Sequence, residues 1–454
     1  MIQAKHGFPA SFFWGTATSA HQVEGDTDNN DWAAWEAIPG KIADGSRSDQ
    51  ACGWWGGAWR DDLDRARQGH QNAHRLSVEW SRIEPAPGEW DEEALEQYRE
   101  MLQGARDRGL QPMVTLHHFT NPIWLAEQGG WLNPEVGQWF ARYVSKVVAA
   151  LGDLTGLWVT INEPNAYAYA AYASGNFPPG HRSISEAIDV IANMARAHGL
   201  AYRAIHELQP HAQVGLAHHY RGMRPLRQWN PLDRWIASLR SSIFNEAVPS
   251  ACQSGEIRLP WKHIPLPEAK GTQDFFGLNY YTRERVAFDL TAVSELFGQG
   301  QYPDHIEVSP TGFIANDPDG FWDALRWAHD FGLPIYVTEN GIEDDEDSLR
   351  RRYLVDHVRK LWRAVNFNWY VKGYFHWTLV DNFEWERGWT QRFGLWELDP
   401  STQIRIKRPS ADLYSAICQA NALTTEIVAE YVPERMDTLF PEYPPGEKNL
   451  GARD

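Results

Sequence analysis

Two glutamates carry the most informative chemistry in this sequence. Glu163 follows the apolar run 157–162, and Glu339 follows the apolar run 334–338. Each adjoins an asparagine and precedes a proline or a glycine, so each stands where a strand would end. Two carboxylates that flank a pocket can cleave a glycosidic bond: one protonates the leaving oxygen, and the other attacks or activates water. A single glutamate of this kind could equally pair with arginine or cap a helix, but the joint pattern favours catalysis.

The elements that must position these glutamates alternate along the chain. Runs rich in β-branched or aromatic residues predict strands buried on both faces, beginning near residues 12, 74, 112, 157, 212, 274, 334 and 372. Amphipathic segments predict helices at 91–108, 134–151, 185–208, 319–331 and 349–367. Eight such alternations predict one closed parallel (β/α)₈ barrel, in which functional side chains gather at the carboxyl ends of the strands. The fourth and seventh strands lie nearly opposite each other on such a ring, so Glu163 and Glu339 should face each other across its mouth.

Other polar or aromatic side chains stand at or just beyond the predicted strand ends. They are Gln22, Arg75, His118, Asn162, His219, Asn279, Tyr281 and Trp377. The histidine pairs 117–118 and 218–219 raise the alternative of a metal site. Adjacent residues on a strand point to opposite faces, however, so neither pair can present both rings to one ion. We expect one histidine of each pair to face the pocket, and no catalytic metal.

Composition restricts the class of protein further. The 454 residues carry a net charge of −18 with no basic run, which argues against nucleic acid and anionic membranes as partners. The first residues lack the apolar segment of a signal peptide, and three widely spaced cysteines suit a reducing compartment, so we expect a cytoplasmic protein. Two irregular stretches, 27–59 and 282–318, are predicted to be long loops within one domain. The 23 tryptophans serve either a large core or stacking on sugar rings.

Four segments resemble the motifs of the family 1 glycoside hydrolases. They are FFWGTATSAHQVEG at 12–25, TINEP at 160–164, VTENG at 337–341 and HWTLVDNFEW at 376–385. The resemblance extends over nearly the whole chain to about residue 420. It implies a single TIM barrel over 1–424 whose long βα loops form a deep sugar pocket. The remaining residues, 425–454, form a Pro- and Glu-rich tail without a recognised counterpart, expected to pack on the barrel or to be partly disordered.

The resemblance implies a retaining mechanism without metal or organic cofactor. Glu163 would be the general acid/base and Glu339 the nucleophile. The implied sugar-binding residues are Gln22, His118, Asn162, Trp377, Glu384 and Trp385, and the implied supports of the nucleophile are Arg75, Asn279 and Tyr281. We expect Arg75 and Tyr281 to hold Glu339 ionised. Glu163, expected to lack such partners, would have its pKa raised towards about 6 by burial.

The implied activity is that of an exo-β-glycosidase, foremost a β-glucosidase. Its substrates would be cello-oligosaccharides, as in cellulose degradation, and aryl or alkyl glycosides, with β-fucosides and β-galactosides as alternatives. Transglycosylation, a non-catalytic sugar-binding barrel and a homo-oligomer also stay open. Glu384 disfavours 6-phosphorylated sugars by charge repulsion, and the presence of Glu163 rather than glutamine disfavours a thioglucosidase.

Three positions depart from the family pattern on the expected aglycone side. Phe119 and Asn165 each stand where the family often has tryptophan, and Ile314 lies in a loop that commonly reads Gly-Trp-Glu. These changes remove aromatic surface. We therefore expect weak stacking on a second sugar and a loose preference for the leaving group. The alternative is that an aromatic side chain from the loops 27–59 or 282–318 fills the gap.

Overall fold

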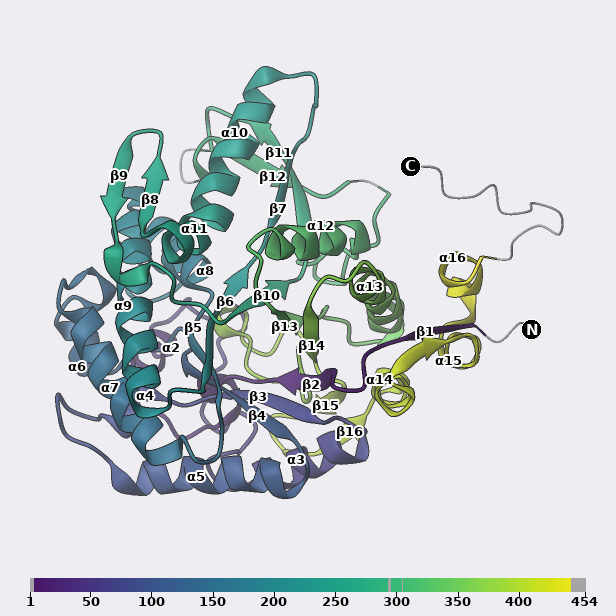
Figure 1. The fold of residues 1–454 in the computed structure, drawn as a ribbon, viewed down its shortest axis with the longest axis horizontal. Coiled ribbons are helices and arrows are strands. Elements are labelled where there is room, and N and C mark those ends of the chain that lie inside the picture. Colours follow the sequence, from purple (N-terminus) through teal and green to yellow (C-terminus); the bar gives the residue numbers. More distant parts are fainter. Residues whose placement is uncertain (1–3, 293–294, 304, 442–454) are drawn as a thin grey trace.

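The protein is built around eight parallel strands that close into a barrel (Figure 1). The computed structural model describes residues 4–292, 295–303 and 305–441. The barrel strands are β2 (Phe13–Ala17), β3 (Ala73–Ser77), β4 (Gln111–His117), β5 (Leu157–Asn162), β6 (Gln213–His219), β10 (Phe275–Tyr280), β13 (Ile335–Asn340) and β14 (Val371–His376). The barrel closes where its last strand, β14, pairs with its first strand, β2, and β6 pairs with β10 in the same ring. All eight predicted runs supply a strand, which confirms the predicted TIM barrel.

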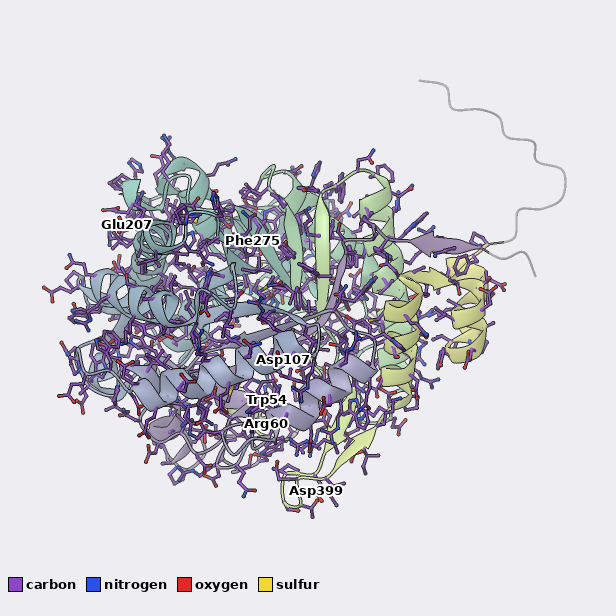
Figure 2. All side chains as sticks on the ribbon, turned by 60° about the horizontal axis from the view of Figure 1, so that its bottom comes forward. Trp54, Arg60, Asp107, Glu207, Phe275 and Asp399 are labelled. Carbon is purple, nitrogen blue, oxygen red and sulfur yellow. The ribbon has the colours of Figure 1, made fainter. Side chains whose placement is uncertain are left out.

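Helices surround the barrel and cover the outer faces of its strands (Figure 1). These helices are α3 (Trp59–Gln68), α5 (Glu92–Asp107), α7 (Val136–Leu151), α9 (Ile184–Leu208), α12 (Pro318–His329), α13 (Ser348–Asn366) and α14 (Pro409–Ala420). The five predicted helices are confirmed to within two residues at each end. Asp91 begins α5 by accepting a hydrogen bond from the Ala94 amide, and Ser183 caps α9 in the same way. Figure 2 labels Phe275, buried at the start of β10, and Asp107, exposed at the end of α5.

Short elements occupy most of the βα loops. The helices are α1 (Ala20–Val23), α2 (Asp31–Glu36), α4 (Trp80–Ile83), α6 (Ile123–Glu127), α8 (Pro164–Ala168), α10 (Pro231–Ser241) and α11 (Ala247–Ser254). The strands are β7 (Gly222–Pro225), β11 (Arg283–Phe288) and β12 (Gly298–Gln301) in one sheet, β8 (Glu256–Leu259) with β9 (Lys262–Pro265), and β15 (Trp396–Leu398) with β16 (Arg405–Lys407).

The two predicted long loops are therefore more ordered than their sequences indicated. The first contains α2, where Trp32 and Trp35 are buried. The second contains β11 and β12, and β11 pairs with β7 from a different loop. Such pairing joins segments about 60 residues apart, so it leaves no local pattern in the sequence from which it could be predicted.

The two ends of the described chain meet beside the barrel (Figure 1). Strand β1 (Lys5–Gly7) pairs antiparallel with β17 (Ala422–Thr424), and α15 (Thr425–Tyr431) and α16 (Met436–Leu439) follow. Ile427 and Val428 of α15 are buried in the core formed by α12, α13 and α14. The first part of the predicted tail thus packs on the barrel, and residues 442–454 lie outside the described residues.

The three cysteines, Cys52, Cys252 and Cys418, are buried and unpaired. Within the described part of the chain, no helix combines the length and the apolar character that crossing a membrane requires.

Candidate active site

Glu163 and Glu339 lie at the carboxyl ends of β5 and β13, where the barrel opens. Both are buried, with exposed fractions of 6% and 3%. Glu163 precedes Pro164, the first residue of α8, and its φ of 44° lies in the left-handed region. A non-glycine residue rarely adopts this conformation without a compensating role. It turns the chain sharply from strand to helix and leaves the glutamate at the mouth of the barrel.

The carboxylate of Glu339 receives two strong hydrogen bonds. Arg75 Nη1 donates to Oε1 at 2.6 Å, and the Tyr281 hydroxyl donates to Oε2 at 2.6 Å. Arg75 is fully buried and is held in turn by Thr115 Oγ1 at 3.0 Å and Asn162 Oδ1 at 2.6 Å. The structure thus places Arg75 and Tyr281 around Glu339, as the resemblance implied, with the guanidinium fixed before any sugar arrives.

Glu163 has two partners of its own, which corrects the expectation that it would have none. His219 Nδ1 lies 3.0 Å from Oε2, and Asn279 Nδ2 donates to Oε1 at 2.7 Å. Asn279 was expected to support Glu339. The Thr338 hydroxyl, however, donates to Asn279 Oδ1 at 2.6 Å, and this bond turns the amide nitrogen towards Glu163. The strand register alone would predict the wrong partner for the Asn279 side chain, because Asn279 lies beside Glu339 in the pairing of β10 with β13.

The electrostatics of the two carboxylates also differ from the expectation. Burial alone would raise the pKa of Glu163, but the His219 imidazole and the Asn279 amide hold it below its ordinary value. Burial raises the pKa of Glu339 to about 7, because it outweighs Arg75 and is reinforced by the negative charge of Glu163. The two groups titrate as a pair. When the pair carries a single proton, Glu339 therefore binds it in preference to Glu163. This is the reverse of the sequence-based expectation.

The predicted sugar-binding side chains gather beside this pair. Gln22 Nε2 donates to Glu384 Oε2 at 3.1 Å and to a backbone carbonyl at 2.8 Å. The His118 ring lies nearly parallel to the rings of Trp377 and Trp385, with centroids 6.1 and 6.0 Å away. Trp385, like Glu163, adopts a positive φ, here 48°. The arrangement combines flat aromatic faces with buried hydrogen-bonding groups, which is the pairing that a pyranose ring requires.

Asn162 connects Arg75, which contacts Glu339, with Asn279 and His118. Its Oδ1 accepts hydrogen bonds from Arg75 and from Asn279 Nδ2, the latter at 3.1 Å, and its Nδ2 lies 3.1 Å from His118 Nε2. The other ring nitrogen of His118, Nδ1, is buried with no partner among the described residues. Buried polar atoms are normally satisfied, so Nδ1 has an unused capacity for a hydrogen bond.

Burial raises the pKa of Glu384 well above its ordinary value, and the charges of Glu386 and Glu339 add to this. The carboxyl group is thus biased towards its neutral form. This weakens the sequence-based argument that a fixed negative charge at Glu384 repels phosphorylated sugars.

The two histidine pairs are arranged as predicted. His118 and His219 face the site, the latter at Glu163. His117 and His218 point the opposite way and make their hydrogen bonds in the layer behind the strands. The rings of each pair therefore diverge, as alternation along a strand requires.

The three residues that depart from the family pattern lie in different surroundings. Phe119 is buried against the rings of His118 and Trp385. Asn165 is also buried, and its Nδ2 donates to the carbonyls of His219 at 2.7 Å and Phe244 at 2.8 Å. Ile314 is 2% exposed within the core, so it forms no wall of an open aglycone site.

Two members of the network were not assigned by sequence reasoning. His219 was identified only as a polar residue at a strand end, and its contact with Glu163 depends on the pairing of β5 with β6. Thr338 lies inside the VTENG motif, directly before Glu339. Its position in that motif was the available signal, but its partner lies on another strand.

Comparisons with known proteins agree with this geometry. Residues 4–423 match the model of glycosyl hydrolase family 1. The chain is 30% identical to a protein named β-glucosidase A from Thermotoga maritima, covering 92% of this chain and 98% of that protein. It is 32% identical to a protein named β-galactosidase from Sulfolobus acidocaldarius, covering 92% and 96%. Among solved structures, a β-glycosidase from Pyrococcus horikoshii is similar with a TM-score of 0.87 at 34% identity, covering 94% of this chain and 98% of the other.

Proposed function

Because this chain belongs to glycosyl hydrolase family 1 and is a β-glycosidase, we propose that it is a retaining exo-β-glucosidase. It would release terminal non-reducing β-D-glucosyl residues from oligosaccharides and from aryl or alkyl glycosides by double displacement. The observation that carries the proposal is the pair Glu163 and Glu339 on nearly opposite strands, linked through Arg75, Asn162 and Asn279. β-Galactosides and β-fucosides are the competing substrates, and related proteins carry both the glucosidase and the galactosidase name.

In the first step, the glycosidic oxygen would lie beside Glu163 and the anomeric carbon beside Glu339. A hydrogen bond to that oxygen can come only from protonated Glu163, so substrate binding raises its pKa. The shared proton then moves from Glu339 to Glu163. The freed carboxylate of Glu339, held by Arg75 and Tyr281, attacks the anomeric carbon while the leaving alcohol takes the proton from Glu163.

In the second step, the charges are reversed. Glu339 is neutral as a glycosyl ester, and Glu163 is an anion stabilised by His219 and Asn279. Glu163 removes a proton from water, the hydroxide attacks the anomeric carbon, and the ester bond to Glu339 breaks. Two inversions at one carbon give net retention.

The role of Glu339 is tested by replacement with glycine. Glu339→Gly should lose hydrolysis of aryl β-glucosides. Azide should restore part of the turnover, because it attacks the anomeric carbon in place of Glu339, displaces the aglycone and gives an α-glucosyl azide. An α-glucosyl fluoride should also be turned over, because its axial fluoride replaces the glycosyl ester as the leaving group. Substantial activity in Glu339→Gly without any added nucleophile would contradict the assignment.

Glu163→Ala tests the acid/base role. This variant should still form the glycosyl ester from substrates with very good leaving groups, and azide should then give a β-glucosyl azide. NMR of the first-formed sugar from the native protein should show the β-anomer, and an α-anomer would exclude double displacement. Comparing kcat/KM across aryl β-glucosides, β-galactosides and β-fucosides then ranks the substrates.

A further inference from the structure

The turn that follows β4 carries His118 in a strained stretch of backbone. β4 ends at His117, and Phe119, the residue after His118, has a φ of 73°. Side chains larger than glycine rarely adopt this left-handed region, because the Cβ atom crowds the backbone. Such a conformation persists only where the surrounding structure holds the chain in it. The contacts that hold this turn therefore also fix the place of the His118 ring beside Trp377 and Trp385.

Two buried carboxylates from other loops hold this turn. Asp31, the first residue of α2, accepts hydrogen bonds from the backbone nitrogen of Asn121 at 2.9 Å and from its Nδ2 at 2.8 Å. The Asp31 amide donates to the Asn121 carbonyl at 2.9 Å in return. Glu79 Oε2 accepts a hydrogen bond from the Thr120 hydroxyl at 2.8 Å. All four residues are buried, so a bond lost here would leave a polar group without water to replace its partner.

Asn121 links the turn to the helix that follows Glu163. Its Nδ2 also donates to the Tyr167 hydroxyl at 2.9 Å, and Tyr167 belongs to α8, which begins directly after Glu163. Its Oδ1 accepts a hydrogen bond from Trp131 Nε1 at 2.8 Å and lies 3.1 Å from His117 Nε2. Every hydrogen-bonding atom of Asn121 is thus in use, so its side chain has a single orientation that satisfies all of its partners.

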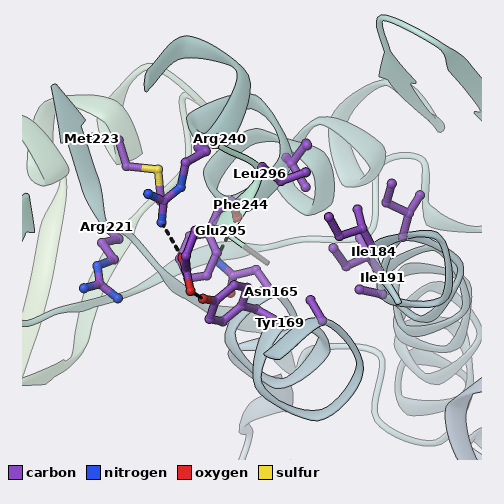
Figure 3. Close-up of a pocket in the computed structure, with 14 residues that line it drawn as sticks. Asn165, Tyr169, Ile184, Ile191, Arg221, Met223, Arg240, Phe244, Glu295 and Leu296 are labelled. Atoms are coloured by element: carbon purple, nitrogen blue, oxygen red, sulfur yellow. Dashed lines mark hydrogen bonds and ion pairs between the residues drawn. The ribbon is translucent and has the colours of Figure 1, made fainter. Parts of the chain in front are cut away.

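The other side of α8 faces a different part of the molecule. Asn165 and Tyr169 lie two positions before and after Tyr167, each about 200° around the helical turn from it. Both line a pocket with mostly apolar walls beside α9 (Figure 3). Asn121 therefore contacts α8 on the side that faces away from this pocket.

We propose that Asp31 is a positioning residue for the glycosidase reaction and acts on the sugar through His118. This inference rests on the proposed function, in which His118 binds the glycone. Asn121 presents two donors to Asp31, and the two carboxylate oxygens accept one each. Asparagine at position 31 would oppose one of these donors with its own N–H groups, so Asn121 would turn away and the strained turn would relax. The His118 ring would then leave its place, and a displacement of about 1 Å at a substrate-binding group can lower the rate about 100-fold.

The first test is a double-mutant cycle with Asp31→Asn and His118→Ala, measured as kcat/KM for an aryl β-glucoside. Asp31→Asn should lower kcat/KM by about 10- to 100-fold in the native protein. In the His118→Ala background it should lower kcat/KM by less than about threefold, because no ring is left to misplace. Equal losses in both backgrounds, or no loss in a folded Asp31→Asn variant, would overturn this proposal alone. A native protein without activity on any aryl β-glycoside would instead overturn the proposed function.

The second test exchanges the two side chains. Combining Asp31→Asn with Asn121→Asp places the amide at position 31 and the carboxylate at position 121, so each donor again faces an acceptor. The Tyr167 hydroxyl can donate as well as accept, so it keeps a partner at position 121. The exchange should bring kcat/KM back to within about threefold of the native value. A folded exchange variant as slow as Asp31→Asn would overturn the proposal.

Asp62→Asn is the matched control. Asp62 is fully buried in α3, where it accepts a hydrogen bond from Trp54 and pairs with Arg65 and Arg405. Its replacement should lower the melting temperature and leave kcat/KM at the native value. A loss of kcat/KM equal to that of Asp31→Asn would show that any missing buried carboxylate has this effect, and would overturn the proposal. If Asp31→Asn does not fold, Asp31→Ser takes its place in the cycle with the same outcomes expected, because serine also removes one acceptor and leaves room for water.

Discussion

Replacement of His219 by phenylalanine should move the acid limb of the pH–rate profile to higher pH. The imidazole lies 3.0 Å from the Glu163 carboxylate, and the two side chains are only 19% and 8% exposed. A hydrogen bond to a charged group contributes roughly 1.5–3 kcal/mol, which corresponds to about 1–2 pKa units. Phenylalanine keeps the ring contacts with Phe244 and Tyr281 but stabilises no anion. The ionised form of Glu163 is then less favoured, so its pKa rises.

The measurement is kcat/KM for an aryl β-glucoside as a function of pH, because this quantity reports the ionisations of the free enzyme. The groups that face Glu163 are His219, Asn279, Arg75 and Glu339. The native alkaline limb should fall near 7, the value to which burial raises the pKa of Glu339, since this pair loses its last proton there. The acid limb, where the pair loses its first proton from Glu163, should lie about 1–2 units higher in His219→Phe, and the alkaline limb should stay near 7.

Two controls separate this effect from a structural one. His219→Asn can donate an uncharged hydrogen bond and should shift the acid limb by less. His218→Asn changes the neighbouring histidine, which points behind the strand to Gln273, and should leave the limb in place. An unchanged acid limb in His219→Phe, or its shift to lower pH, would show that His219 does not stabilise the Glu163 anion.

Three further predictions concern the surroundings of the carboxylates. Glu384→Ala should lower kcat/KM for glucosides by roughly 5- to 150-fold, because two hydrogen bonds from a neutral carboxyl group to the O4 and O6 hydroxyls are worth about 1–3 kcal/mol together. The loss should be much smaller for 6-deoxy β-fucosides, which lack the O6 hydroxyl, and equal losses would show that Glu384 does not bind O6. Arg75→Met should reduce the free energy of unfolding in urea at pH 7 by about 3–5 kcal/mol, because it leaves Glu339 buried without its cation. The double variant with Glu339→Gln should recover part of this loss, and a double variant as unstable as Arg75→Met would show that the unpaired carboxylate is not its cause. Gly341→Ala should lower the free energy of unfolding by about 1–3 kcal/mol and reduce activity on every glycoside, because its Cβ would lie 2.0 Å from the Trp377 carbonyl oxygen. A fully active variant with native thermal stability would show that the backbone moves to relieve this contact without loss.

The sequence alone determined the barrel and the positions of its two glutamates. Strands buried on both faces require continuous apolar runs, and the eight runs were visible because turns and amphipathic helices separate them. A parallel barrel places its functional groups at one end of the strands, so Glu163 and Glu339 followed from their positions after 157–162 and 334–338. These features depend on local patterns and on one general rule of topology.

Only the tertiary structure decided which side chain contacts which. Asn279 lies level with Glu339 along the strands, yet its amide reaches Glu163 because Thr338 orients it. The partner His219 reverses the expected order of the two carboxyl pKa values through a contact of 3.0 Å between neighbouring strands. Hydrogen bonds act over a few ångströms, and no sequence spacing fixes such distances between residues 56 to 116 positions apart.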